Sequence, residues 1–320
     1  METHNSMKKR IINIVGLVMM VAAFGFLVKK FIELDVNLSM LISPKMLLAV
    51  VGMAIVQLLC IALMAHVWRL ILGGFTSILP SWIETSSVFF KSNVGKYLPG
   101  NVGHFLGRQL LGASLGLTQS QLAATSIFET VFVLISGLLT SLIFGSRKLF
   151  ETYRVMSFEH KKVLLVLIPC ALAMLLAVVF LFKKYPSVKE IITRLRTKSF
   201  WVRATGIILL FCLQFLLIGA ILAFLLRLSM PLSIADGPTI IAASTIAWLI
   251  GYITPGVPGG IGMRESVMLL VLTGYPQEIV LSTAIIQRVI MIAGDLLAWG
   301  FGMFLTRRKV TDGKHEKYYE

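Results

Sequence analysis

The sequence has little charge, and the charge it has is unbalanced. Only 14% of its 320 residues are charged, and 30 Lys and Arg against 15 Asp and Glu give a formal net charge of +15. A mean hydropathy of +0.87 is too high for a soluble domain. No stretch of soluble composition is long enough to form a second core. We therefore expect residues 1–320 to form a single integral membrane domain.

Cysteine, metal-binding motifs and nucleotide-binding loops are also scarce or missing. Cys60, Cys170 and Cys212 all lie in apolar runs, where a thiol acts as a small hydrophobe. The five histidines are scattered and no ligand spacing suggests a metal. No nucleophile–base pair is recognisable, so we expect neither a cofactor nor a catalytic activity. Without a folded basic domain, the positive charge does not indicate nucleic-acid binding.

Long apolar runs are what the sequence has in their place. A helix needs about 20 apolar residues to cross the hydrocarbon core. Six runs qualify: 11–28, 46–66, 121–144, 163–182, 204–226 and 279–305. The sequence therefore predicts an all-α polytopic membrane protein. Lys8, Lys9 and Arg10 precede the first run, which is too long for a signal peptide and is expected to stay as an anchor.

Basic clusters predict the orientation of these spans. They lie at 8–10, 183–203 and 307–317, and the positive-inside tendency places all three in the cytoplasm. Both termini are then cytoplasmic, as expected for a multi-pass protein of the cytoplasmic membrane. The loop 145–162 departs from the rule, because it must lie outside and still carries five basic residues.

Two regions between the clear spans are interrupted by glycine and proline. The first broken segment covers residues 81–116 and the second covers 239–274. The apolar run 239–252 has 14 residues, about 21 Å of helix, which is too short to cross. We expect each segment to enter and return as a re-entrant hairpin, the first from the cytoplasm and the second from outside.

The two broken segments also resemble each other in sequence. Aligning "GKYLPGNVGHFLGRQ" with "GYITPGVPGGIGMRE", 156 positions later, matches Gly95, Pro99, Gly100, Gly103 and Arg108 with Gly251, Pro255, Gly256, Gly259 and Arg264. With a two-residue slip, Glu129 aligns with Gln287. An inverted repeat with broken helices is typical of transporters, and its halves would be about 8–145 and 160–306, followed by a polar tail at 307–320. The alternative is a chance recurrence of hairpins.

The turns of the broken segments contain residues that end helices. Pro99, Gly100 and Gly103 would form the first turn, and Pro255, Gly256 and Gly259 the second. Backbone that leaves a helix at membrane depth must be satisfied by protein or by a water-filled cavity. Short helices that start at such turns direct their positive ends toward that cavity, which favours an anion.

Cationic side chains near these turns suggest a phosphate site. Lys96, Arg108, Arg264 and Arg288 are the candidates, and guanidinium groups bind two phosphate oxygens at once. We expect the arginines at 108 and 264 to hold a headgroup from opposite halves. Alternatively, the cations at 96 and 108 snorkel to the headgroup region, or the pairs 264–265 and 288–295 are structural ion pairs.

Carboxylates inside apparent spans are candidates for proton coupling. Glu129 and Asp295 both qualify, because charge in the bilayer is rare and tends to be functional. No cation lies near Glu129 in sequence, which favours a role in proton exchange, while a hydrogen bond to a neighbouring helix is the alternative. Gln57 and Gln214 are expected to form interhelical hydrogen bonds.

The pairing of "KSNVGKYLPGNVGHFLGR" with "TPGVPGGIGMRE" resembles the flippase-like family that includes the membrane region of lysylphosphatidylglycerol synthases. The resemblance implies a flippase that moves anionic or aminoacylated phospholipids, or polyprenyl-phosphate-linked lipids, between leaflets. Carried over by motif, it assigns the headgroup site to Asn93, Lys96, Asn101, Arg108, Arg264 and Glu265. The alternative function is a scaffold for a glycosyltransferase or lipid-modifying enzyme. The synthases continue into an aminoacyl-transferase domain, so this chain is not expected to make lysyl-lipid.

Overall fold

The described part of the chain is helical and contains candidate membrane spans. The computed structural model describes residues 43–76, 79–98, 101–155, 197–254 and 257–316, and the regular structure in these ranges is all helix. Five stretches are long and apolar enough to cross a membrane: Pro44–Leu72, Gln119–Gly145, Lys198–Ser229, Ile234–Ile253 and Gln277–Thr306. Four of them contain predicted spans, while 11–28 and 163–182 lie outside the described residues. The chain is therefore an all-α, multi-pass membrane protein.

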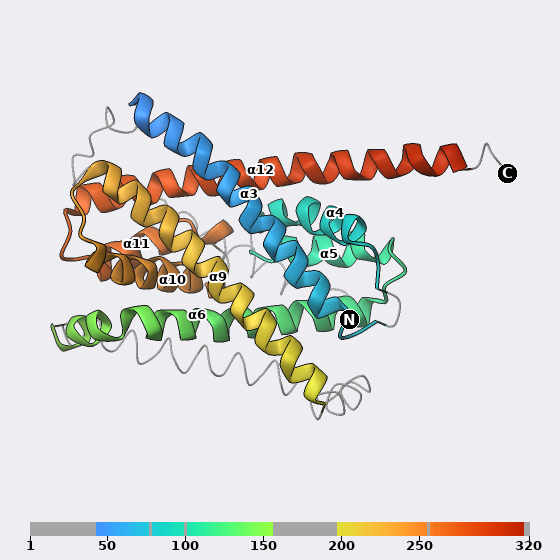
Figure 1. The fold of residues 1–320 in the computed structure, drawn as a ribbon, viewed down its shortest axis with the longest axis horizontal. Helices are drawn as coiled ribbons and strands as arrows, with labels where there is room; N and C mark the ends of the chain where they lie inside the picture. Colours follow the sequence, from blue (N-terminus) through green and yellow to red (C-terminus); the bar gives the residue numbers. More distant parts are fainter. Residues whose placement is uncertain (1–42, 77–78, 99–100, 156–196, 255–256, 317–320) are drawn as a thin grey trace, which may run out of the picture.

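One order of elements occurs twice along the chain. The first set is α3 (Pro44–Leu72), α4 (Trp82–Asn93), the 3-10 turn η1 (Val94–Tyr97), α5 (Gly103–Ala113) and α6 (Gln119–Val155). The second set is α9 (Lys198–Ser229), η2 (Ile234–Asp236), α10 (Gly237–Ile253), η3 (Pro258–Gly260), α11 (Met263–Val271) and α12 (Gln277–Glu316). In each set two long helices flank a pair of short helices joined by a 3-10 turn (Figure 1).

The helix α10 is longer than the apolar run that predicted it. The run 239–252 has 14 residues, but α10 has 17, and together with η2 it forms a 20-residue candidate span. Pro238 lies in the first turn of α10, where the missing N–H leaves no intrahelical hydrogen bond unmade. By length alone this stretch can cross, so its role as one arm of a hairpin stays a prediction.

Serine caps start the two helices that lead into the first turn. The Ser43 hydroxyl accepts the Met46 N–H at 3.3 Å, and Pro44 follows as the first helical residue of α3. At α4, the Ser81 hydroxyl accepts the Glu84 N–H at 3.3 Å and the Glu84 carboxylate accepts the Ser81 N–H at 2.8 Å. This reciprocal capping box fixes the start of α4, and therefore where its last turn delivers Asn93.

The first short helix of each pair packs against a long helix of the other set. The helix α12 packs on α3 and α4, and in the corresponding way α6 packs on α9 and α10. The helices α3 and α9 also contact each other (Figure 1). The two turns contact each other, and all three residues of η3 are buried while those of η1 are partly exposed.

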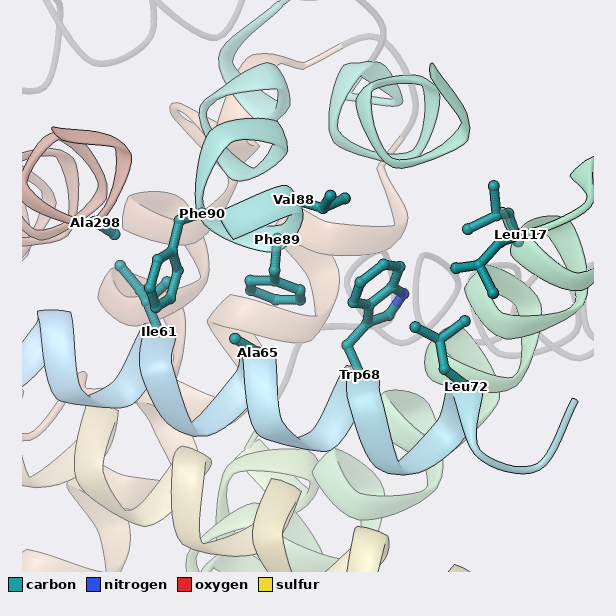
Figure 2. Close-up of a cluster of buried hydrophobic side chains, with 10 residues drawn as sticks. Ile61, Ala65, Trp68, Leu72, Val88, Phe89, Phe90, Leu117 and Ala298 are labelled. Carbon is teal, nitrogen blue, oxygen red and sulfur yellow. The ribbon is translucent and has the colours of Figure 1, made fainter. Parts of the chain in front are cut away.

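An aromatic cluster holds α4 against α3. Figure 2 shows Ile61, Ala65 and Trp68 of α3 pointing toward Phe89 and Phe90 of α4. The centroids of the Trp68 and Phe89 rings are 6.2 Å apart and the rings meet at an interplanar angle of 50°, a tilted arrangement within the distance range of favourable aromatic pairs. This packing fixes α4, whose C-terminus leads directly into η1.

Candidate functional site

A central cleft is lined by both sets of helices. It encloses about 820 Å³, part of it open to its surroundings, and its wall includes residues of α3, α4, α5, α6, α9, α10, α11 and α12 as well as both turns. Six predicted site residues line it: Asn93, Lys96, Asn101, Arg108, Glu129 and Arg264. Gly259 of the second turn lines it too. Residues more than 150 positions apart in the sequence therefore share one cavity.

The first turn is held to α12 through Asp295. This carboxylate is fully buried, and it accepts hydrogen bonds from the Asn93 amide at 2.7 Å and the Tyr97 hydroxyl at 2.5 Å. The Lys96 ammonium forms an ion pair with it at 2.8 Å. Three donors from one end of α4 and η1 thus meet a single acceptor, and we call this group the Asp295 clasp.

The second turn is held to the same helix through Arg288. Its guanidinium donates to the carbonyl oxygens of Gly259 at 2.5 Å and Gly260 at 3.0 Å, and it forms an ion pair with Glu265 at 2.9 Å. The other Glu265 oxygen accepts the Gly262 N–H at 2.7 Å and so caps the start of α11. We call this group the Arg288 clasp. The roles of Arg288 and Glu265 in headgroup binding stay predictions.

Backbone segments approach closely at both turns, which explains some of the glycines. A side chain on Gly103 would collide with the Gly95 carbonyl group, so α5 can pass the end of α4 only with glycine there. In the second turn, a Cβ on Gly260 would lie 2.8 Å from the Gly251 Cα, and Gly260 has φ +72°. Pro99, Gly100, Pro255 and Gly256, also assigned to the turns, lie outside the described residues.

Asn101 connects the two broken segments. Its φ is +56°, a value that asparagine tolerates better than most residues. The side-chain amide donates to the Tyr252 carbonyl oxygen of α10 at 3.2 Å. The residue predicted to contact substrate therefore also ties the first turn to the second helix pair.

Arg108 is buried and has a carboxylate partner within its own half. Its guanidinium forms an ion pair with Glu129 of α6 and lies over the Phe89 ring, with Cζ 4.1 Å from the ring centroid. The alternative that Arg108 snorkels to the headgroup region does not hold, because only 2% of its side chain is exposed. No cation lies near Glu129 in sequence, but α5 folds back along α6 and brings Arg108 to it in space.

Arg264 lies in the corresponding place of the second half, but it has no carboxylate partner among the described residues. Its Nη1 lies 3.7 Å from the Met291 sulfur, and its Cζ lies 5.1 Å from the centroid of the Trp248 ring. Its Nε is buried without a hydrogen-bond partner. Arg264 is only 9% exposed. An anion is the group that would satisfy such a guanidinium best.

The ion pairs that sequence spacing offered as an alternative are replaced by other pairs. Arg288 and Asp295 share a face of α12, but seven residues separate them by about 10 Å along the axis, too far for contact. Arg264 and Glu265 are neighbours, and adjacent helical residues point in different directions. The side chains therefore reach other elements: Lys96 is paired with Asp295, and Arg288 with Glu265.

Two glutamines line the cleft with unsatisfied oxygens. Gln57 of α3 and Gln214 of α9 are both buried, and the Oε1 atom of each has no hydrogen-bond partner in the described residues. The expectation that these oxygens bond across helices is therefore wrong. They leave the cleft with acceptors for a hydroxyl or ammonium group of a ligand.

Several lining residues were missed by the sequence reasoning. His104, Trp248 and Tyr252 line the cleft, and Tyr97 belongs to the Asp295 clasp. Tyr97 and His104 lie within the first turn's own motif, so their position beside the proline was an available signal. The Trp248 and Tyr252 rings stack with their centroids 5.0 Å apart. The two residues are one helical turn apart in an apolar run, where the sequence alone suggests that aromatic side chains face lipid or the core.

Four cationic side chains and three carboxylates thus lie at or near the cleft, and their pairing leaves the arginine of α11 without a counter-ion among the described residues. A cleft with this excess of positive charge can bind an anion, while its glutamine oxygens can accept hydrogen bonds from donors.

No curated protein gives a match to the chain. Residues 13–298 match the family model described as the lysylphosphatidylglycerol synthase TM region, so the chain belongs to that family.

Proposed function

We propose that this protein is a lipid flippase. It moves an anionic or aminoacylated phospholipid, or a polyprenyl-phosphate-linked lipid, between the leaflets of the cytoplasmic membrane, and the headgroup passes through the central cleft. The family supports a task in lipid synthesis or transport. The observation that carries the proposal is Arg264, a buried cation in the cleft that has no carboxylate partner in the part of the chain that the structure describes.

The chemistry of the cleft fits a lipid headgroup. The guanidinium at 264 suits a phosphate, and the Gln57 and Gln214 oxygens suit hydroxyl or ammonium donors. Movement needs no covalent step, so we propose no enzymatic activity and no cofactor. The lipid is the partner, together with a lipid-modifying enzyme or glycosyltransferase that supplies or uses it.

We further propose an inverted repeat of six crossing spans and two opposed re-entrant hairpins, with both termini in the cytoplasm. The repeated order of elements supports it, and so does the glycine-dependent packing at both turns. Cysteines introduced at Ser157 and Ser187 test the topology with an impermeant thiol reagent. We expect labelling of the first from outside only and of the second from inside only, and the reverse pattern would refute the arrangement.

Leaflet exchange in vesicles tests the function. The purified chain is reconstituted in vesicles that carry a trace of fluorescent phosphatidylglycerol, and an impermeant quencher reports the outer-leaflet fraction with time. The flippase proposal expects the inner-leaflet pool to become accessible at a rate that rises with protein per vesicle. A rate equal to that of protein-free vesicles would instead favour a scaffold that binds a partner enzyme without moving lipid.

A further inference from the structure

The corresponding arginines of the two halves of the cleft have different partners. Arg108 on α5 is neutralised by Glu129 on α6. The residue that aligns with this carboxylate in the repeat is Gln287 of α12, which is uncharged and donates its amide to the Ile218 carbonyl oxygen of α9 at 2.9 Å. The second half therefore lacks the carboxylate that the first half supplies.

The groups around Arg264 give it no compensating negative charge by direct contact. Met291 faces it from α12, Trp248 from α10 and Gly260 from η3. The nearby carboxylates at 265 and 295 are already engaged by Arg288 and Lys96. A buried guanidinium that has no carboxylate partner among the described residues is costly, and an anion that reached it from the cleft would remove that cost.

We propose that the cleft binds one headgroup phosphate, at Arg264, and that Glu129 is a resident anion that occupies the equivalent place at Arg108. The assignment rests on the proposed flippase function and names the side of the cleft that holds the substrate. It changes the expectation that both arginines grip one headgroup from opposite halves, because the one in the first half already has its anion.

Direct binding to the purified full chain tests this assignment. The probe is dihexanoyl phosphatidylglycerol, titrated calorimetrically into protein in a non-ionic detergent, and the expected stoichiometry is one per chain. Met291→Glu places a carboxylate beside the Arg264 guanidinium and should weaken binding by about tenfold or more, since one charge-assisted contact is lost to an internal competitor. Met291→Gln, of the same shape without the charge, should weaken binding far less than Met291→Glu.

Neutralising each half separately sharpens the test. The double variant Arg108→Met with Glu129→Gln removes a matched pair of charges and should keep one site of nearly normal affinity. Arg264→Met should weaken the affinity for the lipid by about tenfold or more. Glu129→Gln alone frees the first arginine and should raise the stoichiometry toward two. Thermal unfolding measured for every variant identifies any variant that fails to fold. If the double variant fails to fold, the comparison of the two Met291 variants still shows whether the phosphate binds at Arg264.

Three results would overturn the proposal. They are equal binding by the two Met291 variants, a loss in the double variant as large as that in Arg264→Met, or displacement of the lipid by inorganic phosphate at the concentration at which the lipid itself binds. The last would make the ligand a free phosphate and not a headgroup. Failure of the proposed function is distinguishable: binding that depends on Arg264 without leaflet exchange refutes transport and leaves this site in place.

Discussion

The first broken segment offers hydrogen-bond donors to α12, whereas the second offers acceptors. Asn93, Lys96 and Tyr97 converge on Asp295, while the Gly259 and Gly260 carbonyl oxygens converge on Arg288. The two clasps lie seven residues apart on one helix, so α12 holds both turns with opposite charges. The same plan of short helix, 3-10 turn and short helix is thus stabilised by side chains in one half and mainly through the backbone in the other.

This difference assigns different consequences to mutations in the two halves. Loss of the Asp295 clasp strands a lysine whose side chain is only 21% exposed, together with an amide and a hydroxyl. Loss of the Arg288 clasp leaves two carbonyl oxygens and one carboxylate without their cation. Loss of either clasp therefore leaves one charge without its partner, on a lysine in the first half and on a glutamate in the second.

The largest effect is expected for Asp295→Leu. Removing one member of a buried ion pair leaves an uncompensated charge, at a cost of about 3–5 kcal/mol. The measurement is the unfolding free energy in detergent. Adding Lys96→Met to Asp295→Leu removes the stranded charge and should recover part of the loss. A single variant as stable as wild type would show that the clasp does not hold the first turn.

Alanine at the close backbone contacts should have the next largest effect. Gly260→Ala forces an L-residue to φ +72° and brings its Cβ 2.8 Å from the Gly251 Cα, so we expect a loss of about 2 kcal/mol or more. Gly103→Ala, which meets the Gly95 carbonyl, should lose a similar amount. Gly52→Ala is the matched control, because nothing lies within 4 Å of its Cβ. Equal stability of all three variants would contradict the close packing of the turns.

Arg288→Lys tests the second clasp while keeping its charge. A lysine cannot serve both carbonyl oxygens and Glu265, and the loss of charge-assisted hydrogen bonds should cost about 2 kcal/mol. Arg227→Lys, at an exposed position of α9, is the control and should unfold like wild type. If the two substitutions cost the same, the fork geometry at Arg288 does not matter.

The smallest effect is expected for the coupling of transport to protons. Protonation of Glu129 would release Arg108 for a second anion, so lipid exchange should respond to a pH gradient imposed on vesicles. Glu129→Gln should abolish that response and still bind lipid. A gradient response in the Gln variant as large as in wild type would remove this carboxylate from the mechanism and leave it a structural partner of the arginine.

The sequence predicted where helices break but not which charges pair. Proline and glycine at 99–100 and 255–256 marked the two interruptions, and the described helices end and start on either side of them. Local spacing also identified every charged residue of the two clasps. Their pairing could not be predicted, because Lys96 and Asp295 are 199 positions apart and meet only once α4 packs on α12. The same holds for Tyr97, whose partner Asp295 is 198 positions away, and for Trp248, whose role depends on which face of α10 turns toward the cleft.

The rate of leaflet exchange in vesicles that contain Arg264→Lys is the most direct test of the account. The variant keeps the positive charge and loses the bidentate fork, so we expect slower exchange of fluorescent phosphatidylglycerol than with wild type, by about tenfold, at equal reconstituted and folded protein. Arg108→Lys, whose cation is already matched by Glu129, should slow exchange less. If Arg264→Lys exchanges lipid as fast as wild type, the claim that the headgroup binds to Arg264 in this cleft is contradicted.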